Sequence, residues 1–248
     1  MLKKFEFMKY TENDFLQRYR SRSDLSSFVT HLTRGNDELN SIEVLLKILD
    51  EKVIHGSGKE GYIMGKNKAT CFQEAPPYGV AQNVYHEQQR RLKSKTIDNL
   101  IEYFKQLKIK DFDDEKKIIE KLVQLTIAWE NESKEKRRYS GIGLMFRKSI
   151  VFEKGGRPVI YEGSDLAKEM ISEDQHWRIV NLNLSDKENL IDWTHEREWR
   201  VKGDFEFEHS EAIVVLTNEK AYQAFIKKCE PNILQELAGI ITLEGMLS

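Results

Sequence analysis

Residues 194–201 read Thr-His-Glu-Arg-Glu-Trp-Arg-Val, and this run is the densest group of side chains that could do chemistry. On a strand, successive side chains alternate between the two faces. Glu196 and Glu198 would then share a face with Arg200, with the two carboxylates about 7 Å apart. Such a pair forms either an exposed ion-pair ladder or a site built to hold charge. Trp199, on the opposite face, is expected to anchor the strand in the core.

A second group lies early in the chain, in the run Phe-Val-Thr-His-Leu-Thr at 28–33. On a strand, His31 and Thr33 point the same way. An imidazole and a hydroxyl can each donate or accept a hydrogen bond, so the pair suits the vicinal hydroxyls of a ribose. The alternative is a histidine at a strand edge that binds no ligand, because motifs this short often occur by chance.

Two further runs carry side chains that suit a flat or charged ligand. The run 71–77, Cys-Phe-Gln-Glu-Ala-Pro-Pro, ends a strand at two prolines, so Phe72 either stacks on a planar ring or packs in the core. Between Tyr139 and Arg147, glycines permit a close approach of the backbone or simply a bend. Arg147 either binds a pyrophosphate through two parallel hydrogen bonds or remains a solvated surface charge.

Signatures of other catalytic classes are missing from the sequence. There is no His-Glu-x-x-His motif, no Walker loop and no Gly-x-Ser-x-Gly elbow. The six histidines show no metal-ligand spacing, so no metal site is expected. The two cysteines, Cys71 and Cys229, form neither a metal motif nor a disulfide framework. No cluster of acidic metal ligands supports a nuclease.

The composition is typical of a folded, water-soluble protein. The 248 residues are 40% hydrophobic and 10% aromatic, which is enough for a sizeable core. A formal net charge of −2 excludes the overall positive charge of a dedicated nucleic-acid binder. No apolar run approaches the roughly 18 residues that cross a bilayer. The sequence therefore predicts a cytoplasmic protein without a membrane partner.

The elements that must position these side chains follow from periodicity and turn residues. Strands are predicted over 28–33, 69–72, 141–146, 158–161, 179–184, 191–201, 212–216 and 239–243. Asn40 and Glu43 have capping-box spacing ahead of a helix that ends near Lys52. Further helices are predicted over 219–229 and from Pro231 onward. The pattern indicates an α+β fold with its strands concentrated in the second half.

The middle of the chain differs in character. From about 87 to 138 there is no glycine or proline, and apolar residues recur at helical spacing, which predicts two or three helices. We therefore expect a single domain over residues 1–248, with a helical insertion at about 87–138. The apolar stripes of this insertion suit the surface of a protein partner.

The order of the motifs resembles that of bacterial abortive phage-resistance proteins of the AbiGi-like group. It is more remotely similar to ADP-ribosyltransferase-like enzymes, such as the DarT-type toxins that modify DNA. The similarity covers roughly residues 28–85 and 139–216. It runs through His-x-Thr, Cys-Phe-x-Glu-x-Pro, Tyr-Ser-Gly-Ile-Gly-Leu-x-Phe-Arg-Lys, Pro-Val-Ile-Tyr and Glu-Arg-Glu-Trp-Arg-Val.

This resemblance implies a split mixed or antiparallel β-sheet with flanking helices, which clamps NAD in a central cleft. It implies that the catalytic glutamate is Glu198 or Glu196. The Glu-x-Glu spacing looks like that of arginine-directed transferases, in which the second glutamate is catalytic, so we expect Glu198 to act on the ribose and Glu196 to serve the acceptor. His31, with Thr33 beside it, would hold a ribose. The sequence departs from the pattern of these enzymes in lacking a Ser-Thr-Ser triplet, which leaves the subclass and the acceptor open.

The remaining expected roles also come from the resemblance. Arg34 or Arg147 would bind the pyrophosphate, and Tyr139 or Phe72 would stack on nicotinamide. The expected reaction cleaves the nicotinamide–ribose bond of NAD and transfers ADP-ribose to a protein, a nucleic acid or water, in phage defence. The alternative is a non-catalytic binding or regulatory module of the same fold, within a toxin–antitoxin or abortive-infection system.

Overall fold

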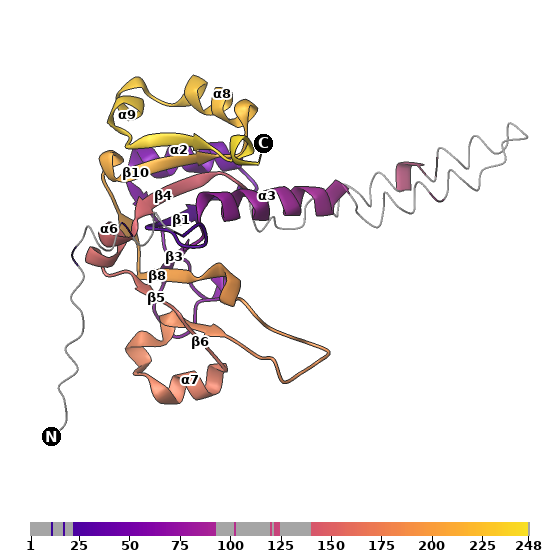
Figure 1. The fold of residues 1–248 in the computed structure, drawn as a ribbon, viewed down its shortest axis with the longest axis vertical. Coiled ribbons are helices and arrows are strands. Elements are labelled where there is room, and N and C mark those ends of the chain that lie inside the picture. Colours follow the sequence, from indigo (N-terminus) through magenta and orange to yellow (C-terminus); the bar gives the residue numbers. More distant parts are fainter. Residues whose placement is uncertain are drawn as a thin grey trace, which may run out of the picture. The chain divides into compact units, whose positions relative to one another are not determined.

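The computed structural model describes residues 22–92 and 140–247, together with positions 11, 17, 102, 120 and 122–124. The chain forms two compact units, one of residues 1–81 with 141–248 and one of residues 82–140. The first unit contains a mixed seven-stranded sheet with flanking helices, so the predicted α+β class is confirmed (Figure 1).

The large sheet draws its strands from both ends of the chain. Its members are β1 (Phe28–Leu32), β3 (Ala69–Gln73), β4 (Gly143–Arg147), β5 (Arg157–Pro158), β8 (Glu198–Lys202), β10 (Ala212–Leu216) and β11 (Gly239–Thr242). They lie in the order β11-β10-β4-β1-β3-β8-β5. All neighbours are antiparallel except β10 and β11, which are parallel.

The centre of this sheet is its weakest junction. Strand β1 pairs with β4 along its full length, and β3 does so with β8. Between β1 and β3 the register has a single partner pair, Thr30 opposite Gln73. The sheet therefore consists of two well-paired halves that meet at one narrow contact.

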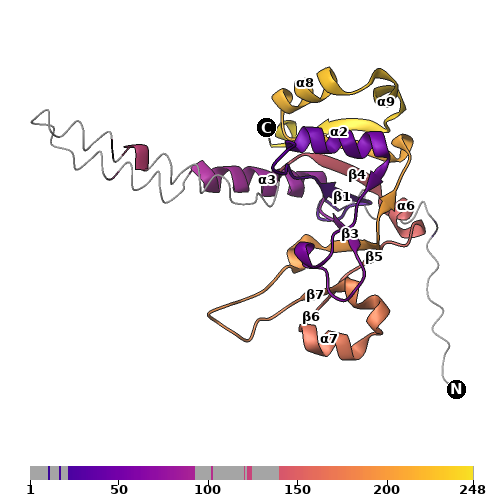
Figure 2. The same cartoon turned by 180° about the vertical axis from the view of Figure 1, so that it is seen from behind.

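Two small sheets complete the first unit. Strand β2 (Val53–Ile54) pairs antiparallel with β9 (Phe205–Glu206), and β6 (Ile160–Glu162) pairs parallel with β7 (Ile179–Asn181). Helix α7 (Ser164–Met170) connects β6 to β7. Both views place β6 and α7 beyond the β5 edge of the large sheet, at the opposite end from α8 and α9 (Figures 1 and 2).

Three predicted helices form with the caps that the sequence indicates. Helix α2 spans Ser41–Glu51, and Asn40 forms the expected capping box with Glu43. Helix α8 (Glu219–Lys228) begins after Asn218, whose side chain accepts a hydrogen bond from a backbone amide of the first turn. Helix α9 (Pro231–Glu236) starts at proline, whose missing N–H costs nothing in a first turn.

An aromatic cluster fills the core on one face of the large sheet. Phe146 lies 5.0 Å from Phe205 and 5.1 Å from Phe207, measured between ring centroids, and both pairs meet edge to face. Side chains of α2 and α8, including Leu45 and Phe225, pack into the same cluster. The two helices thus cover this face of the sheet, to which β3 and β8 contribute Phe72 and Val201.

Three helices were not indicated by the sequence pattern, and one of them is α7. Helix α3 (Pro77–Leu92) begins about ten residues before the expected helical region, because Pro77 starts the helix rather than ending the preceding strand. Helix α6 (Lys148–Glu153) follows β4 directly, without a side-chain cap or a glycine to mark it. The expected insertion at 87–138 lies almost wholly outside the described residues. No helix of the described ranges is long and apolar enough to cross a membrane.

Candidate functional site

The run 194–201 does not form one continuous strand, which corrects the predicted strand over 191–201. Thr194–Glu196 forms a 3₁₀ turn, and Arg197 follows in a left-handed conformation with φ of 45°. Strand β8 begins only at Glu198. The two glutamates are therefore not successive members of one strand face. Glu198 is held by the sheet, whereas Glu196 is held by the turn before it.

Glu198 is fixed by an ion pair with Arg200. The Nε and Nη2 atoms of Arg200 donate to the two carboxylate oxygens of Glu198 at 2.8 and 3.2 Å. Its Nη1 atom donates to two backbone carbonyls, those of Trp177 at 2.7 Å and Ile179 at 3.1 Å. The Arg200 side chain is 4% exposed and that of Glu198 is 18% exposed. A nearly buried guanidinium thus holds a partly exposed carboxylate in one orientation.

A thiol from the neighbouring strand lies beside this ion pair. Cys71 is the partner of Arg200 in the register of β3 and β8, so their side chains share a face. Burial, reinforced by the nearby Glu198 carboxylate, raises the pKa of the Cys71 thiol well above its ordinary value. The Cys71 thiol therefore keeps its proton in the ordinary range of pH and can donate it to Glu198, and a protonated thiol is a poor nucleophile.

Tyr161 of β6 closes the other side of Glu198. Its hydroxyl oxygen accepts a hydrogen bond from the backbone N–H of Glu198 at 2.7 Å. Burial raises the pKa of Tyr161 to about 12, and the carboxylates of Glu198 and Glu196 act in the same direction. The phenol therefore keeps its proton in the ordinary range of pH.

Gln73 connects Glu196 to the sheet. It is the register partner of Glu198, and its Nε2 atom donates to Oε2 of Glu196 at 2.7 Å. Gln73 is 6% exposed, and its Oε1 atom is buried without a hydrogen-bond partner. The strand β3 thus brings both glutamates of the sequence motif to one place, although they approach it from different elements.

His31 lies at the narrow junction between the two halves of the sheet. Its Nδ1 atom is 2.8 Å from the carbonyl oxygen of Cys71, so the ring reaches across the gap between β1 and β3. A carbonyl can only accept, so Nδ1 carries the proton and Nε2 is left as an acceptor. Burial lowers the pKa of His31, with a smaller effect of Arg34 in the same direction. The imidazole is therefore neutral.

The backbone of Cys71 joins the two predicted parts of the site. Its carbonyl holds His31, and its side chain faces Arg200. By strand alternation His31 belongs to the same face as Phe72, while Glu198 belongs to the other face. Gly143 allows the close approach of β4 to β1 at His31, since a Cβ there would lie 2.0 Å from the carbonyl oxygen of His31. His31 and Glu198 are thus linked through β3, and do not share a face.

Two expected ligand contacts are wrong. Phe72 is 2% exposed and meets Phe146 and Phe205 edge to face, so it is a core side chain that cannot stack on nicotinamide. Thr33 is also buried, and its hydroxyl donates to the backbone carbonyl of Ile142 at 3.1 Å. That bond fixes the strand end and leaves Thr33 unsuited to a ribose.

The expected charged and aromatic contacts are dispersed. Arg34 follows β1 and is exposed, whereas Arg147 ends β4 opposite Phe28, at the far end of the same strand pair. The guanidinium of Arg147 lies 6.0 Å from the centroid of the Phe28 ring. The structure therefore does not bring the two arginines together. Tyr139 lies outside the described residues.

The predicted position of Trp199 in the core is confirmed. It packs against the main core cluster from the face opposite Glu198. Its Nε1 atom donates to Glu74 at 2.7 Å, and the other oxygen of Glu74 lies 2.6 Å from Nζ of Lys148. Glu74, a member of the Cys-Phe-x-Glu motif, is thus a structural link between β3, β8 and α6.

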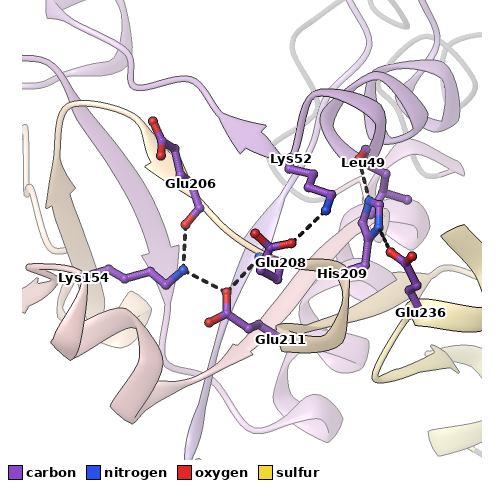
Figure 3. Close-up of polar contacts among 8 residues, drawn as sticks. All are labelled: Leu49, Lys52, Lys154, Glu206, Glu208, His209, Glu211 and Glu236. Atoms are coloured by element: carbon purple, nitrogen blue, oxygen red, sulfur yellow. Dashed lines mark hydrogen bonds and ion pairs between the residues drawn. The ribbon is translucent and has the colours of Figure 1, made fainter.

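A second charged cluster lies elsewhere in the first unit, where β9 leads into β10 (Figure 3). Lys52 pairs with Glu208 at 2.7 Å, and Lys154 pairs with Glu211 at 2.8 Å. The first of these pairs, together with His209, Ser210 and Glu236, lines a surface hollow of about 370 Å³. Since its charges are matched in opposite pairs, the cluster is a set of links between segments and offers little unmatched charge to a ligand.

His209 is the buried centre of this second cluster. Its Nδ1 atom lies 2.7 Å from Oε2 of Glu236, and its Nε2 atom lies 2.7 Å from the carbonyl oxygen of Leu49 (Figure 3). Leu49 belongs to the last turn of α2, where carbonyls lack helical partners. The imidazole therefore fastens α9 to the C-terminal end of α2.

Sequence reasoning missed three members of the site: Gln73, Tyr161 and Cys71. Gln73 and Cys71 lay in a quoted motif, but their role depends on the register between β3 and β8. Tyr161 lay in the Pro-Val-Ile-Tyr run, with no local signal that it reaches Glu198. Among the described residues, no group of three His, Cys, Asp or Glu side chains is arranged to hold a metal ion.

The sequence was compared with protein-family models and with curated proteins, and the structure with solved structures. None of these comparisons found a match.

Proposed function

We propose that the protein is an ADP-ribosyltransferase-like enzyme that cleaves the nicotinamide–ribose bond of NAD. The observation that carries the proposal is the fixed carboxylate of Glu198, held at both oxygens by Arg200 next to the narrow sheet junction. A carboxylate oxygen has two acceptor positions, and Arg200 engages one on each atom, so Glu198 can still accept from a ribose hydroxyl.

The chemistry requires a fixed negative charge. The bond between ribose C1′ and the nicotinamide nitrogen breaks, and its electron pair goes to the nitrogen. Positive charge develops on the ribose, and a carboxylate already in place stabilises it without reorganisation. Water or a macromolecular nucleophile then bonds to C1′ and releases a proton. Glu198 is the group that we assign to this stabilisation.

The other polar groups fit supporting roles. The neutral His31 offers Nε2 as an acceptor for a hydroxyl at the junction, because the carbonyl of Cys71 fixes the tautomer. Glu196, 20% exposed on the turn before β8, is placed to orient or deprotonate an acceptor. The resemblance in motif order supports NAD as the substrate and phage defence as the setting. The split-sheet fold of such enzymes is in keeping with the single register pair between β1 and β3.

The test compares nicotinamide release from NAD by the wild-type protein and by Glu198→Gln. The variant removes the charge and keeps the side-chain volume, so we expect a loss of roughly 10²–10³-fold in rate. Glu206→Gln is the matched control, because Glu206 is an exposed carboxylate on β9 away from the site. Equal release by wild type and Glu198→Gln would rule out this assignment of Glu198. The same three proteins, expressed during phage infection, measure whether any reduction in plaque number depends on Glu198.

A non-catalytic binding or regulatory module is the second candidate. One observation favours it: among the described residues, two hollows of about 370 and 550 Å³ lie away from Glu196 and Glu198 and could hold a ligand or a partner segment. This candidate predicts NAD or protein binding without nicotinamide release. A protein partner for the helical insertion stays a prediction, because most of that segment lies outside the described residues. Calorimetric titration with NAD, beside the release assay, separates the two functions.

A further inference from the structure

The buried oxygen of Gln73 is the first sign of a specific ligand contact. The hydrogen bond to Glu196 orients the Gln73 amide, because an ionised carboxylate can only accept and therefore faces Nε2. The Oε1 atom then points elsewhere and lacks a partner among the described residues. A buried acceptor without a donor is costly, and such groups are rare in folded proteins. A ligand that brings an N–H donor would satisfy it.

The hydroxyl of Tyr161 is the second sign. Its oxygen accepts from the backbone of Glu198, so the position of that oxygen is fixed. In this bond the oxygen accepts, so the bond does not use the hydroxyl hydrogen. The phenol stays protonated, because burial raises the pKa of Tyr161 to about 12. It is therefore a fixed donor that a ligand oxygen can use.

These two groups flank Glu198 from opposite sides. Gln73 lies on β3 as the cross-strand partner of Glu198. Tyr161 lies on the other side, where the carbonyl of Glu198 also accepts from the backbone of Val159 at 3.0 Å. The acceptor oxygen of Gln73 thus lies on one side of Glu198, and the donor hydroxyl of Tyr161 lies on the other.

We propose that Gln73 and Tyr161 recognise the carboxamide of nicotinamide. The carboxamide NH₂ donates to Oε1 of Gln73, and the carboxamide oxygen accepts from the hydroxyl of Tyr161. This arrangement would place the bond to be broken beside Glu198, and it rests on the proposed function. Gln73 and Tyr161 are then specificity-determining residues, and the ligand class is a pyridine carboxamide attached to ribose.

The experiment measures kcat/KM for NAD and for its 3-acetylpyridine analogue, in which a methyl group replaces the carboxamide NH₂. The wild-type protein should prefer NAD by on the order of tenfold or more, because the analogue leaves the Gln73 oxygen without a donor. In Gln73→Leu this preference should fall to near one. Gln175→Leu, a change of the same size on a surface turn, is the control and should keep the wild-type preference.

Tyr161→Phe provides an independent readout. Both dinucleotides keep the carbonyl oxygen, so the variant should raise KM several-fold for both and leave the preference between them unchanged. A purely structural role for the hydroxyl would lower the melting temperature without this rise in KM. Inhibition by free nicotinamide should weaken in both Gln73→Leu and Tyr161→Phe.

The outcomes separate this proposal from the function on which it rests. NAD cleavage that needs Glu198, with no preference for NAD over the analogue in the wild type, would overturn carboxamide recognition alone. This comparison uses the unaltered protein, so it stands even if a variant fails to fold. Failure of the wild type to cleave or bind NAD would overturn both proposals.

Discussion

The ring of His31 connects two strands of the sheet. The hydrogen bond to the carbonyl of Cys71 puts the imidazole in the gap between β1 and β3, where backbone hydrogen bonds are otherwise few. The same bond decides which nitrogen carries the proton, which in turn decides what the free nitrogen can recognise. One backbone carbonyl thus fixes the chemistry of a side chain on another strand.

The neutral state of His31 predicts a dependence of stability on pH. Burial lowers the pKa of His31 in the folded protein below the ordinary value of 6.5, so the unfolded chain binds the proton more readily. The corresponding stability is fully present above about pH 6.5 and is lost as pH falls through the folded-state pKa.

Urea unfolding of the wild type and His31→Asn between about pH 8 and pH 5 measures this effect. Asparagine keeps a donor for the Cys71 carbonyl and removes the titrating group. The free energy of unfolding should fall less steeply toward low pH in the variant. Identical slopes for the two proteins would show that His31 does not contribute.

At the scale of elements, the capping box at the start of α2 stabilises the helix by hydrogen bonds within its first turn. The Asn40 side chain accepts from the backbone amides of Ile42 and Glu43 at 3.0 and 3.2 Å, while Glu43 accepts from the amide of Asn40 at 3.0 Å. These bonds satisfy amides that have no partner within the helix.

Asn40→Ala should lower the free energy of unfolding by about 0.5–2 kcal/mol, because it removes the cap of a helix that covers the core. Lys47→Ala, on the exposed side of α2, is the control and should change it by less than about 0.5 kcal/mol. Denaturant titrations of both variants make the comparison. If Lys47→Ala lowered the free energy of unfolding as much as Asn40→Ala, the capping argument would be contradicted.

The elements that sequence reasoning located correctly are those with local signals. Caps and proline placed α2, α8 and α9, and apolar runs placed β1, β3, β4 and β10. The turn before β8 had no such signal, because Arg197 adopts a left-handed conformation that usually marks glycine or asparagine. The run therefore looked like one strand.

The residues of the candidate site also differ in whether a local sequence signal identifies them. Glu196 and Glu198 could be singled out because carboxylates and arginines crowd one short run. Their partners could not, since Gln73 reaches Glu196 through a strand register that no local pattern encodes. The burial of Phe72 and Thr33 was equally hidden, because it depends on which segments cover each face of the sheet.

At the scale of the whole molecule, His209 joins segments that are far apart in sequence. It contacts the end of α2 and the end of α9 through two hydrogen bonds of 2.7 Å. Replacement by phenylalanine keeps a flat ring and removes both bonds, which leaves a buried carbonyl of α2 without its donor.

His209→Phe should therefore lower the free energy of unfolding by roughly 1–3 kcal/mol. Ser210→Ala, an exposed neighbour on the same turn, is the control and should stay within about 0.5 kcal/mol of the wild type. Urea titrations give the energies, and amide hydrogen exchange should rise first in α9. A loss below about 0.5 kcal/mol for His209→Phe would show that the two bonds do not stabilise the fold.

The strand order has a consequence for the time at which the protein can fold. Strands β1 and β3 leave the ribosome early. The strands with which they pair along their full length, β4 and β8, emerge only after the second unit has been made. At ordinary synthesis rates this interval is on the order of ten seconds. During it, two strands rich in apolar residues have open edges that can pair with other chains. Nascent chains of this protein should therefore depend on chaperones until β8 is available.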